Sequence, residues 1–145
     1  MNPQRDTRTI KQTVEIPAKP EQVYKAYTDP EQHTAFTGEK ATGEAKVGNT
    51  VSAFDGYITA KYVELVPGKR IVQEWRTNAN PARGASGWPA NYPPSILEIT
   101  LEPKGEGTKL TMVHREVPAE HADQYADGWK KKYWKPLEEH FTKKK

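Results

Sequence analysis

The sequence contains no cysteine among its 145 residues. This absence excludes a disulfide framework, a thiol nucleophile and a zinc site built from thiolates. A chain without cysteine is also compatible with a reducing compartment, and we therefore expect a cytoplasmic protein.

Long apolar runs are missing as well. Nowhere do about 18 apolar residues follow one another, which is the length that a membrane-spanning helix needs. The first residues, Met1 to Lys11, include Arg5, Asp6 and Arg8 and lack the apolar stretch of a signal peptide. We expect neither secretion nor insertion into a membrane.

The chain also lacks a large net charge. The formal net charge is +3, from 22 basic and 19 acidic residues, and the terminal run Lys143, Lys144 and Lys145 accounts for that excess. The body of the protein is therefore close to neutral, and we expect no nucleic-acid partner.

What the chain does have is aromatic side chains, with four Trp and seven Tyr in a sequence that is only 34% hydrophobic. A length of 145 residues fits one domain with a real core. We predict a single domain over residues 1–145, ordered from about 7 to 142, with tails at 1–6 and 143–145. Its core is expected to be built from large rings.

Strands are predicted by alternating apolar residues and by turn dipeptides. Thr7 to Ile16 alternates and ends at Pro17, and Asp55-Gly56 is a strong hairpin signal. From Glu39 to Arg115 the pattern predicts six consecutive antiparallel strands in a meander. These strands are expected at 43–47, 50–54, 57–66, 70–76, 95–102 and 108–114.

Two short helices are predicted after the first strand. Pro20 to Thr28 is amphipathic and begins with the proline that suits a first helical turn. A second helix has Asp29 as its N-cap and Pro30 as its first residue, and it stops before Gly38.

A long C-terminal helix is predicted from Pro118 to about Thr142. Apolar rings and a leucine recur every four residues down one face, and Pro136 is expected to kink the helix. This face needs a large apolar partner, for which only the concave side of the sheet is available. The stripe consists of Tyr125, Trp129, Tyr133, Leu137 and Phe141.

Several stretches resemble one known family in sequence and in order. They are Asp29-Pro30-Glu31, Phe54-Asp55-Gly56, the run 65–72, Glu74-Trp75-Arg76 and the run 128–137. The chain is similar in these stretches to homologues of the activator of heat-shock-protein-90 ATPase, and the likeness extends from about Thr9 to Phe141. The order of elements also resembles the helix-grip fold of the START-like, or SRPBCC, superfamily.

This resemblance implies an α+β fold in which a curved antiparallel sheet is wrapped around the long C-terminal helix. It also implies a hydrophobic cavity between sheet and helix, because the superfamily contains binders of hydrophobic hormones, lipid carriers and polyketide cyclases. The eukaryotic members of the family are co-chaperones, so a role in the stress response is implied as well.

Ten residues are candidates for lining the cavity. The alternative is that these rings and aliphatic groups simply fill the core. In the proline-rich break from Thr77 to Pro94, Trp88 and Tyr92 are candidates for a lid, the alternative being that they anchor the loop. The ten residues are Phe36, Phe54, Tyr62, Trp75, Trp88, Ile99, Met112, His114, Trp129 and Tyr133.

His114 is the one titratable group expected at the cavity, where it would orient a polar head group unless neighbouring groups satisfy it locally. With Tyr62 or Tyr133 it would form the acid and base pair of a cyclase or dehydratase. The acidic residues and histidines from His114 to Asp123 lack a His-Glu-x-x-His pattern, so no metal site and no cofactor are expected.

Three functions remain open at this point. The first is non-enzymatic binding of a small hydrophobic or amphipathic molecule in the cavity. The second is a module that contacts a heat-shock-protein-90-type chaperone through the outer face of the sheet or the basic groups Lys130–Lys132 and Lys143–Lys145. The third is a cyclase-type enzyme that depends on His114.

Overall fold

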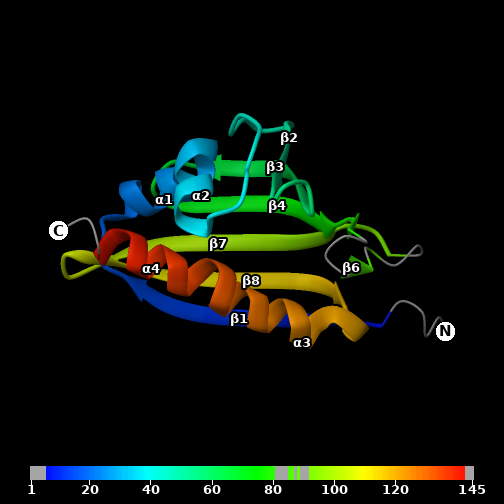
Figure 1. Ribbon diagram of the computed structural model, residues 1–145. Helices are drawn as coiled ribbons and strands as arrows, with labels where there is room; N and C mark the ends of the chain where they lie inside the picture. The colour runs from blue at the N-terminus through cyan, green and yellow to red at the C-terminus, as the bar shows by residue number, and fades with distance from the viewer. Residues whose placement is uncertain (1–5, 81–84, 87, 89–91, 143–145) are drawn as a thin grey trace.

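The computed structural model describes residues 6–80, 85–86, 88 and 92–142 (Figure 1). Of the predicted tails at 1–6 and 143–145, all residues except Asp6 lie outside the described residues, as does part of the long break. The elements in chain order are β1 (Thr7–Ile16), α1 (Pro20–Thr28), α2 (Pro30–Thr37), β2 (Thr50–Ala53), β3 (Ile58–Val66), β4 (Arg70–Thr77), β5 (Ala79–Asn80), β6 (Ala85–Ser86), β7 (Ser95–Lys104), β8 (Gly107–Pro118), α3 (Ala119–Gly128), the π-helical segment η3 (Trp129–Trp134) and α4 (Lys135–Thr142).

A six-stranded antiparallel sheet in the order β1-β8-β7-β4-β3-β2 forms one layer. The helical run α3, η3 and α4 lies along one face of this sheet, and α1 and α2 cover the same face beside α4 (Figure 1). The predicted α+β fold with a curved sheet around a long C-terminal helix is therefore confirmed.

The two faces of the sheet differ as the alternating pattern predicts. On β7, Leu97, Ile99 and Leu101 face the helix and are 0%, 1% and 4% exposed. Between them Glu98 points outward, where it forms ion pairs with Arg70 of β4 and Arg115 of β8. The outer face of the sheet thus carries ion pairs between neighbouring strands, and the apolar core lies between the sheet and the helices.

The strand predicted over Gly43–Val47 is wrong. Those residues form no strand, and the bridge beside them, between Thr42 and Ser52, is an isolated one. Gly43 has φ +106°, and a Cβ atom there would lie 2.6 Å from Cγ1 of Val51. The close approach of the backbone to β2 requires glycine and breaks the extended geometry of a strand.

The break from Thr77 to Pro94 contains structure that the sequence did not predict. Thr77 ends β4, and β5 and β6 pair with each other as a separate two-stranded sheet. Residues 81–84, 87 and 89–91 of this stretch lie outside the described residues.

The long helix keeps its predicted stripe but contains an irregularity. Its five stripe residues are between 0% and 7% exposed. In η3 the Lys135 N–H donates to the carbonyl of Lys130, five residues earlier. Pro136 follows directly and has no N–H to donate to an earlier carbonyl, so the predicted disturbance takes the form of a π-helical segment before the proline.

The π-helical segment explains how a stripe with a strict four-residue spacing faces one sheet. In a regular α-helix with 3.6 residues per turn, each step of four residues rotates the stripe by about 40°. A stretch with i→i+5 bonds has wider turns, which counteracts this rotation. Trp129, Tyr133 and Leu137 consequently stay on the same side, at 3%, 3% and 0% exposure.

None of the helices within the described residues is long and apolar enough to cross a membrane.

Candidate functional site

Aromatic rings from the sheet and the helix meet in the core beneath η3. The ring of Trp75 on β4 lies 5.8 Å from that of Trp129, and Trp129 lies 4.6 Å from Tyr133. Large rigid rings do not fill the space between a helix and a curved sheet completely, and two cavities remain beside them.

The larger cavity has a volume of about 390 Å³, which is within the range of small-molecule sites. It lies between the β2–β3 turn, β4 and the face of α3 and η3. Apolar and aromatic side chains form its inner wall, and charged side chains stand at the rim. Its lining consists of Glu39, Phe54, Tyr57, Ile58, Trp75, Gln124, Tyr125, Asp127, Gly128, Trp129, Lys131, Lys132 and Tyr133.

The β2–β3 turn holds one wall of this cavity in a fixed position. Asp55 and Gly56 have φ of +56° and +88°, as the central residues of a type I′ turn require, and Phe54 also has a positive φ of +52°. The Asp55 N–H donates to the carbonyl of Lys40 at 2.9 Å, and the Asn78 amide donates to the carbonyl of Gly56 at 3.0 Å. These bonds hold the Phe54 ring 5.5 Å from that of Tyr133.

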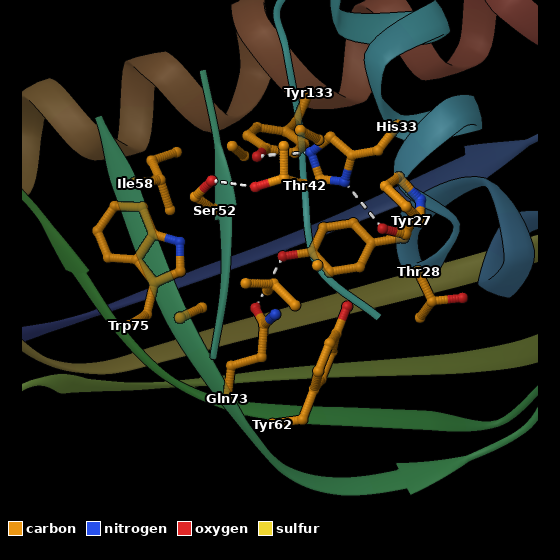
Figure 2. Close-up of a pocket in the computed structure, with 16 residues that line it drawn as sticks. Tyr27, Thr28, His33, Thr42, Ser52, Ile58, Tyr62, Gln73, Trp75 and Tyr133 are labelled. Atoms are coloured by element: carbon orange, nitrogen blue, oxygen red, sulfur yellow. Dashed lines mark hydrogen bonds between the residues drawn. The ribbon is translucent and has the colours of Figure 1, made fainter. Parts of the chain in front are cut away.

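The smaller cavity, of about 20 Å³, lies between α1, α2, β2, β3 and β4 (Figure 2). Polar groups from separate elements are joined in its wall. The Tyr27 hydroxyl donates to Oε1 of Gln73 at 2.9 Å. Three side chains, Ile58, Trp75 and Tyr133, line both cavities, so the two spaces are neighbours.

His33 connects α2 to the C-terminal helix and was missed as a site residue. Its Nδ1 lies 2.8 Å from the carbonyl of Tyr27, which only accepts, so Nδ1 carries the hydrogen. Its Nε2 then accepts from the Tyr133 hydroxyl at 2.9 Å. Burial lowers the pKa of His33, in agreement with a neutral ring.

His114 is completely buried and lines neither cavity. Its Nδ1 accepts from the Trp129 indole N–H at 3.1 Å, and its Nε2 lies 2.7 Å from Oγ of Ser95. Because Trp129 only donates, the His114 hydrogen is on Nε2 and is donated to Ser95, whose hydroxyl donates to the carbonyl of Trp75 at 2.7 Å. Burial lowers the pKa of His114 to about 3.

The titratable side chains of the inner walls are uncharged at neutral pH. Burial raises the pKa of Tyr27, Tyr62 and Tyr133, and it raises the pKa of Tyr125 to about 12. These four phenols therefore keep their hydrogens. The described walls present neutral donors and aromatic faces, and the charged groups stay at the rim.

Trp88 lies against two rings of the large cavity, although it is not part of the lining itself. Its ring is parallel to that of Tyr125, at an interplanar angle of 5° and a centroid distance of 6.3 Å, and meets Trp75 edge-on. Its indole N–H donates to the carbonyl of Tyr92 at 3.0 Å, and the Tyr92 hydroxyl donates to the carbonyl of Asp6. Both predicted roles of Trp88, a lid over the cavity and an anchor of the loop, are compatible with this placement.

The ten predicted site residues fall into three groups. Those that line a cavity are Phe54, Tyr62, Trp75, Trp129 and Tyr133. Trp88 covers two of the lining rings. Those that are packed in the core without lining either cavity are Phe36, Ile99, Met112 and His114.

Sequence reasoning did not place Tyr57, Gln124 and Tyr125 at the large cavity, or Tyr27 and Gln73 at the small one. Tyr125 belongs to the predicted helix stripe, which was the available signal. Tyr57 follows the Asp55-Gly56 turn, and a turn signal does not reveal which way the next ring points.

The described residues contain no cluster of three or more His, Cys, Asp or Glu side chains arranged to hold a metal ion.

The fold and its cavities define a helix-grip domain, in which a curved sheet and a long helix enclose space between them. The chain belongs to the family described as "Activator of Hsp90 ATPase homolog 1-like protein", whose family model matches residues 17–142.

Comparisons with individual proteins agree with this membership. The chain is 31% identical over 133 residues to the human activator of 90 kDa heat shock protein ATPase homolog 1, which covers 92% of the chain. Among solved structures, an HSP90 activator from Plasmodium falciparum superimposes with a TM-score of 0.78 at 24% identity, over 92% of this chain and 96% of that one. The Aha1 dimer from Colwellia psychrerythraea has a TM-score of 0.71 at 20% identity, over 90% and 96%.

The chain spans only about a third of the length of the curated relatives, with 36% of the human protein matched. The two solved structures, at identities below 25%, support the fold.

Proposed function

We propose that this domain binds a small hydrophobic molecule in the cavity of about 390 Å³ between the β2–β3 turn and the C-terminal helix. The observation that carries the proposal is the size and wall of this cavity, whose inner side is formed by rings from three separate elements. Phe54 comes from the turn, Trp75 from β4 and Trp129 from η3.

Burial of apolar surface supplies the affinity. A ligand that buries about 300 Å² of apolar area gains about 7.5 kcal/mol before the costs of ordering and association are subtracted. Because a micromolar dissociation constant corresponds to about 8.2 kcal/mol, we expect binding weaker than micromolar for a ligand of this size. Aromatic ligands gain additionally from stacking against the existing rings.

Gly128 offers a direct test of the cavity. It lines the space, has the helical φ of −62°, and a Cβ atom built on it meets no other atom within 4 Å. Gly128→Leu should therefore occupy part of the cavity without a clash. Gly128→Ala is the matched control, since it changes the helix propensity in the same direction and fills little space.

The measurement is titration with the neutral fluorescent probe N-phenyl-1-naphthylamine, followed by energy transfer from tryptophan. The parent and Gly128→Ala should bind the probe, and Gly128→Leu should bind it at least tenfold more weakly. Equal binding by all three proteins would place the probe outside this cavity. Absence of binding, together with no change in melting temperature for a panel of lipids and aromatic compounds, contradicts the proposal.

A second candidate function, contact with a heat-shock-protein-90-type chaperone, is favoured by the similarity over 92% of the chain to the human ATPase activator. The lysines of η3, Lys130 to Lys132, are exposed, with Lys131 and Lys132 at the large cavity, and they form the described part of the predicted basic surface. Lys143–Lys145 lie outside the described residues.

This second function is tested by the ATPase rate of such a chaperone with and without the domain. If the basic surface makes the contact, Lys130→Glu with Lys132→Glu should abolish a change in rate, through loss of electrostatic attraction. The matched control is Lys11→Glu with Lys25→Glu, which reverses the same number of charges at exposed positions on β1 and α1. An unchanged ATPase rate with the parent domain contradicts this function.

A further inference from the structure

The indole N–H groups of the four tryptophans differ in one respect. Trp88 donates to the carbonyl of Tyr92 at 3.0 Å, Trp129 to Nδ1 of His114 at 3.1 Å and Trp134 to Oε1 of Gln12 at 2.8 Å. Trp75 is 4% exposed, and no acceptor for its buried Nε1 is found among the residues that the structure describes.

A buried donor without an acceptor is uncommon, because the group has left water and gained nothing in return. The indole nitrogen is a donor only, so no rearrangement of its own hydrogens relieves this cost. The neighbouring oxygens, Oε1 of Gln73 and the Tyr133 hydroxyl, form hydrogen bonds with Tyr27 and His33, and neither accepts from Trp75. The described residues thus leave this donor open for an acceptor atom of a ligand.

Figure 2 shows the nitrogen-bearing edge of the Trp75 ring turned toward the interior of the small cavity, facing Tyr27 and Tyr133. That cavity, of about 20 Å³, has room for one group the size of a water molecule. A carbonyl oxygen has this size. Because Trp75 and Tyr133 also line the large cavity, an oxygen in the small space and an apolar body in the large one are neighbours.

The neutral surroundings of the Trp75 indole restrict the chemical class of the ligand further. The phenols and imidazoles around this position are neutral, and the lysines and carboxylates of the site stand at the rim of the large cavity. A carboxylate placed next to Trp75 would lose its hydration without meeting a cation, at a large cost. A neutral acceptor meets no such penalty.

We infer that Trp75 is the orienting residue of the site and that its ligands are neutral apolar or aromatic carbonyl compounds, held by a hydrogen bond from the Trp75 indole to the carbonyl oxygen. This inference rests on the proposed ligand-binding function and adds the chemical class of the ligand. Trp75 acts through its N–H group, while its ring contributes to the apolar wall.

The test compares ligand pairs that differ only in a carbonyl group: indane with 1-indanone, tetralin with 1-tetralone, and fluorene with fluorenone. The protein carries ¹⁵N-labelled tryptophan, so that its four indole signals are observed separately, and Trp75→Phe assigns the signal of Trp75. In at least one pair the ketone should bind about tenfold more tightly, which is the effect of one buried hydrogen bond. The same ketone should shift the Trp75 signal more than its hydrocarbon partner does.

An isosteric replacement isolates the N–H group. Benzothienylalanine at position 75 keeps the two fused rings and lacks the donor, so the preference for the ketone should disappear while the hydrocarbon still binds. The same replacement at Trp134 is the matched control, because that indole already donates to Gln12 and lines neither cavity. There the preference should remain.

The outcomes separate this inference from the function on which it rests. If hydrocarbons and ketones bind equally and move the Trp75 signal equally, the inference is overturned and the ligand-binding function stands. If no member of any pair binds, both are overturned. If the protein with the replacement at position 75 fails to fold, the Trp75 signals of the parent protein still show whether the ketone shifts the indole signal more than the hydrocarbon does.

Discussion

The indole N–H of Trp129 in the C-terminal helix donates to Nδ1 of His114 in the last strand, over 3.1 Å. This bond begins a chain that continues through Ser95 on β7 to the main-chain carbonyl of Trp75 on β4. One imidazole therefore ties the helix to three strands. The direction of each donation requires a neutral ring, so the connection depends on the protonation state of His114.

The first prediction concerns pH. The pKa of His114 is about 3 in the folded protein and about 6.5 in an unfolded chain, so the unfolded chain binds more protons between these values. Stability is consequently full above about pH 6.5 and is lost as the pH falls, by up to about 1.4 kcal/mol per pH unit. His33, whose pKa is also lowered, acts in the same direction. Urea unfolding at pH 7.5, 6 and 5 measures this slope.

His114→Gln should flatten this slope, whatever its effect on stability at pH 7.5, because the titrating group is gone. His121→Gln, at a half-buried position on α3, is the control and should retain the slope of the parent protein. A slope that His114→Gln leaves unchanged would show that His114 binds its proton equally well in the folded and the unfolded chain.

The second prediction concerns Trp88 as a cover of the large cavity. Trp88→Ala removes the ring that stacks on Tyr125 and meets Trp75, so a bound probe should dissociate several-fold faster. Trp88→Phe keeps one aromatic ring and loses the second ring together with the donor to Tyr92, and its dissociation rate should stay nearer to that of the parent than the rate of Trp88→Ala does. Stopped-flow displacement of N-phenyl-1-naphthylamine gives both rates. If Trp88→Ala releases the probe at the parental rate, Trp88 only anchors its segment.

The third prediction concerns the backbone beside β2. Gly43→Ala combines a positive φ with overlap against Val51 and should lower the free energy of unfolding by about 2–4 kcal/mol. Gly48 also has a positive φ, +92°, but a Cβ atom there meets nothing within 4 Å. Gly48→Ala should therefore cost only about 1 kcal/mol. Equal losses in thermal or urea unfolding would mean that the contact with Val51 is not tight.

Local patterns were sufficient to predict most of the fold. The alternation of Leu97, Ile99 and Leu101 and the turn at Asp55-Gly56 depend on near neighbours in sequence, and both are confirmed. The strand expected at Gly43–Val47 failed for the opposite reason, because the proximity of Val51 requires a glycine conformation that the local pattern does not reveal.

The site was less predictable because it is made of contacts between distant residues. The bond from Tyr133 to His33 joins positions 100 residues apart, and no local periodicity marks His33 as its partner. His114 was correctly expected to point inward, but its satisfaction by Trp129 and Ser95 depends on the register between strands and helix. That the Trp75 indole, unlike the other three indoles, has no acceptor among the described residues follows only from three-dimensional packing.

The π-helical segment means that the chain carries one residue more at this point than a continuous α-helix needs. Removing Lys130, which is exposed, changes the spacing from Trp129 to Tyr133 from four residues to three, and a regular α-helix accommodates the resulting stripe. Removing the exposed Asp123 instead rotates Ala122 and everything before it by about 100° relative to Tyr125. Circular dichroism melts should show a small change for the first deletion and a large loss of stability for the second. The additional residue would then be an insertion that the helix accommodates in its π-helical segment, while its buried face stays directed toward the sheet.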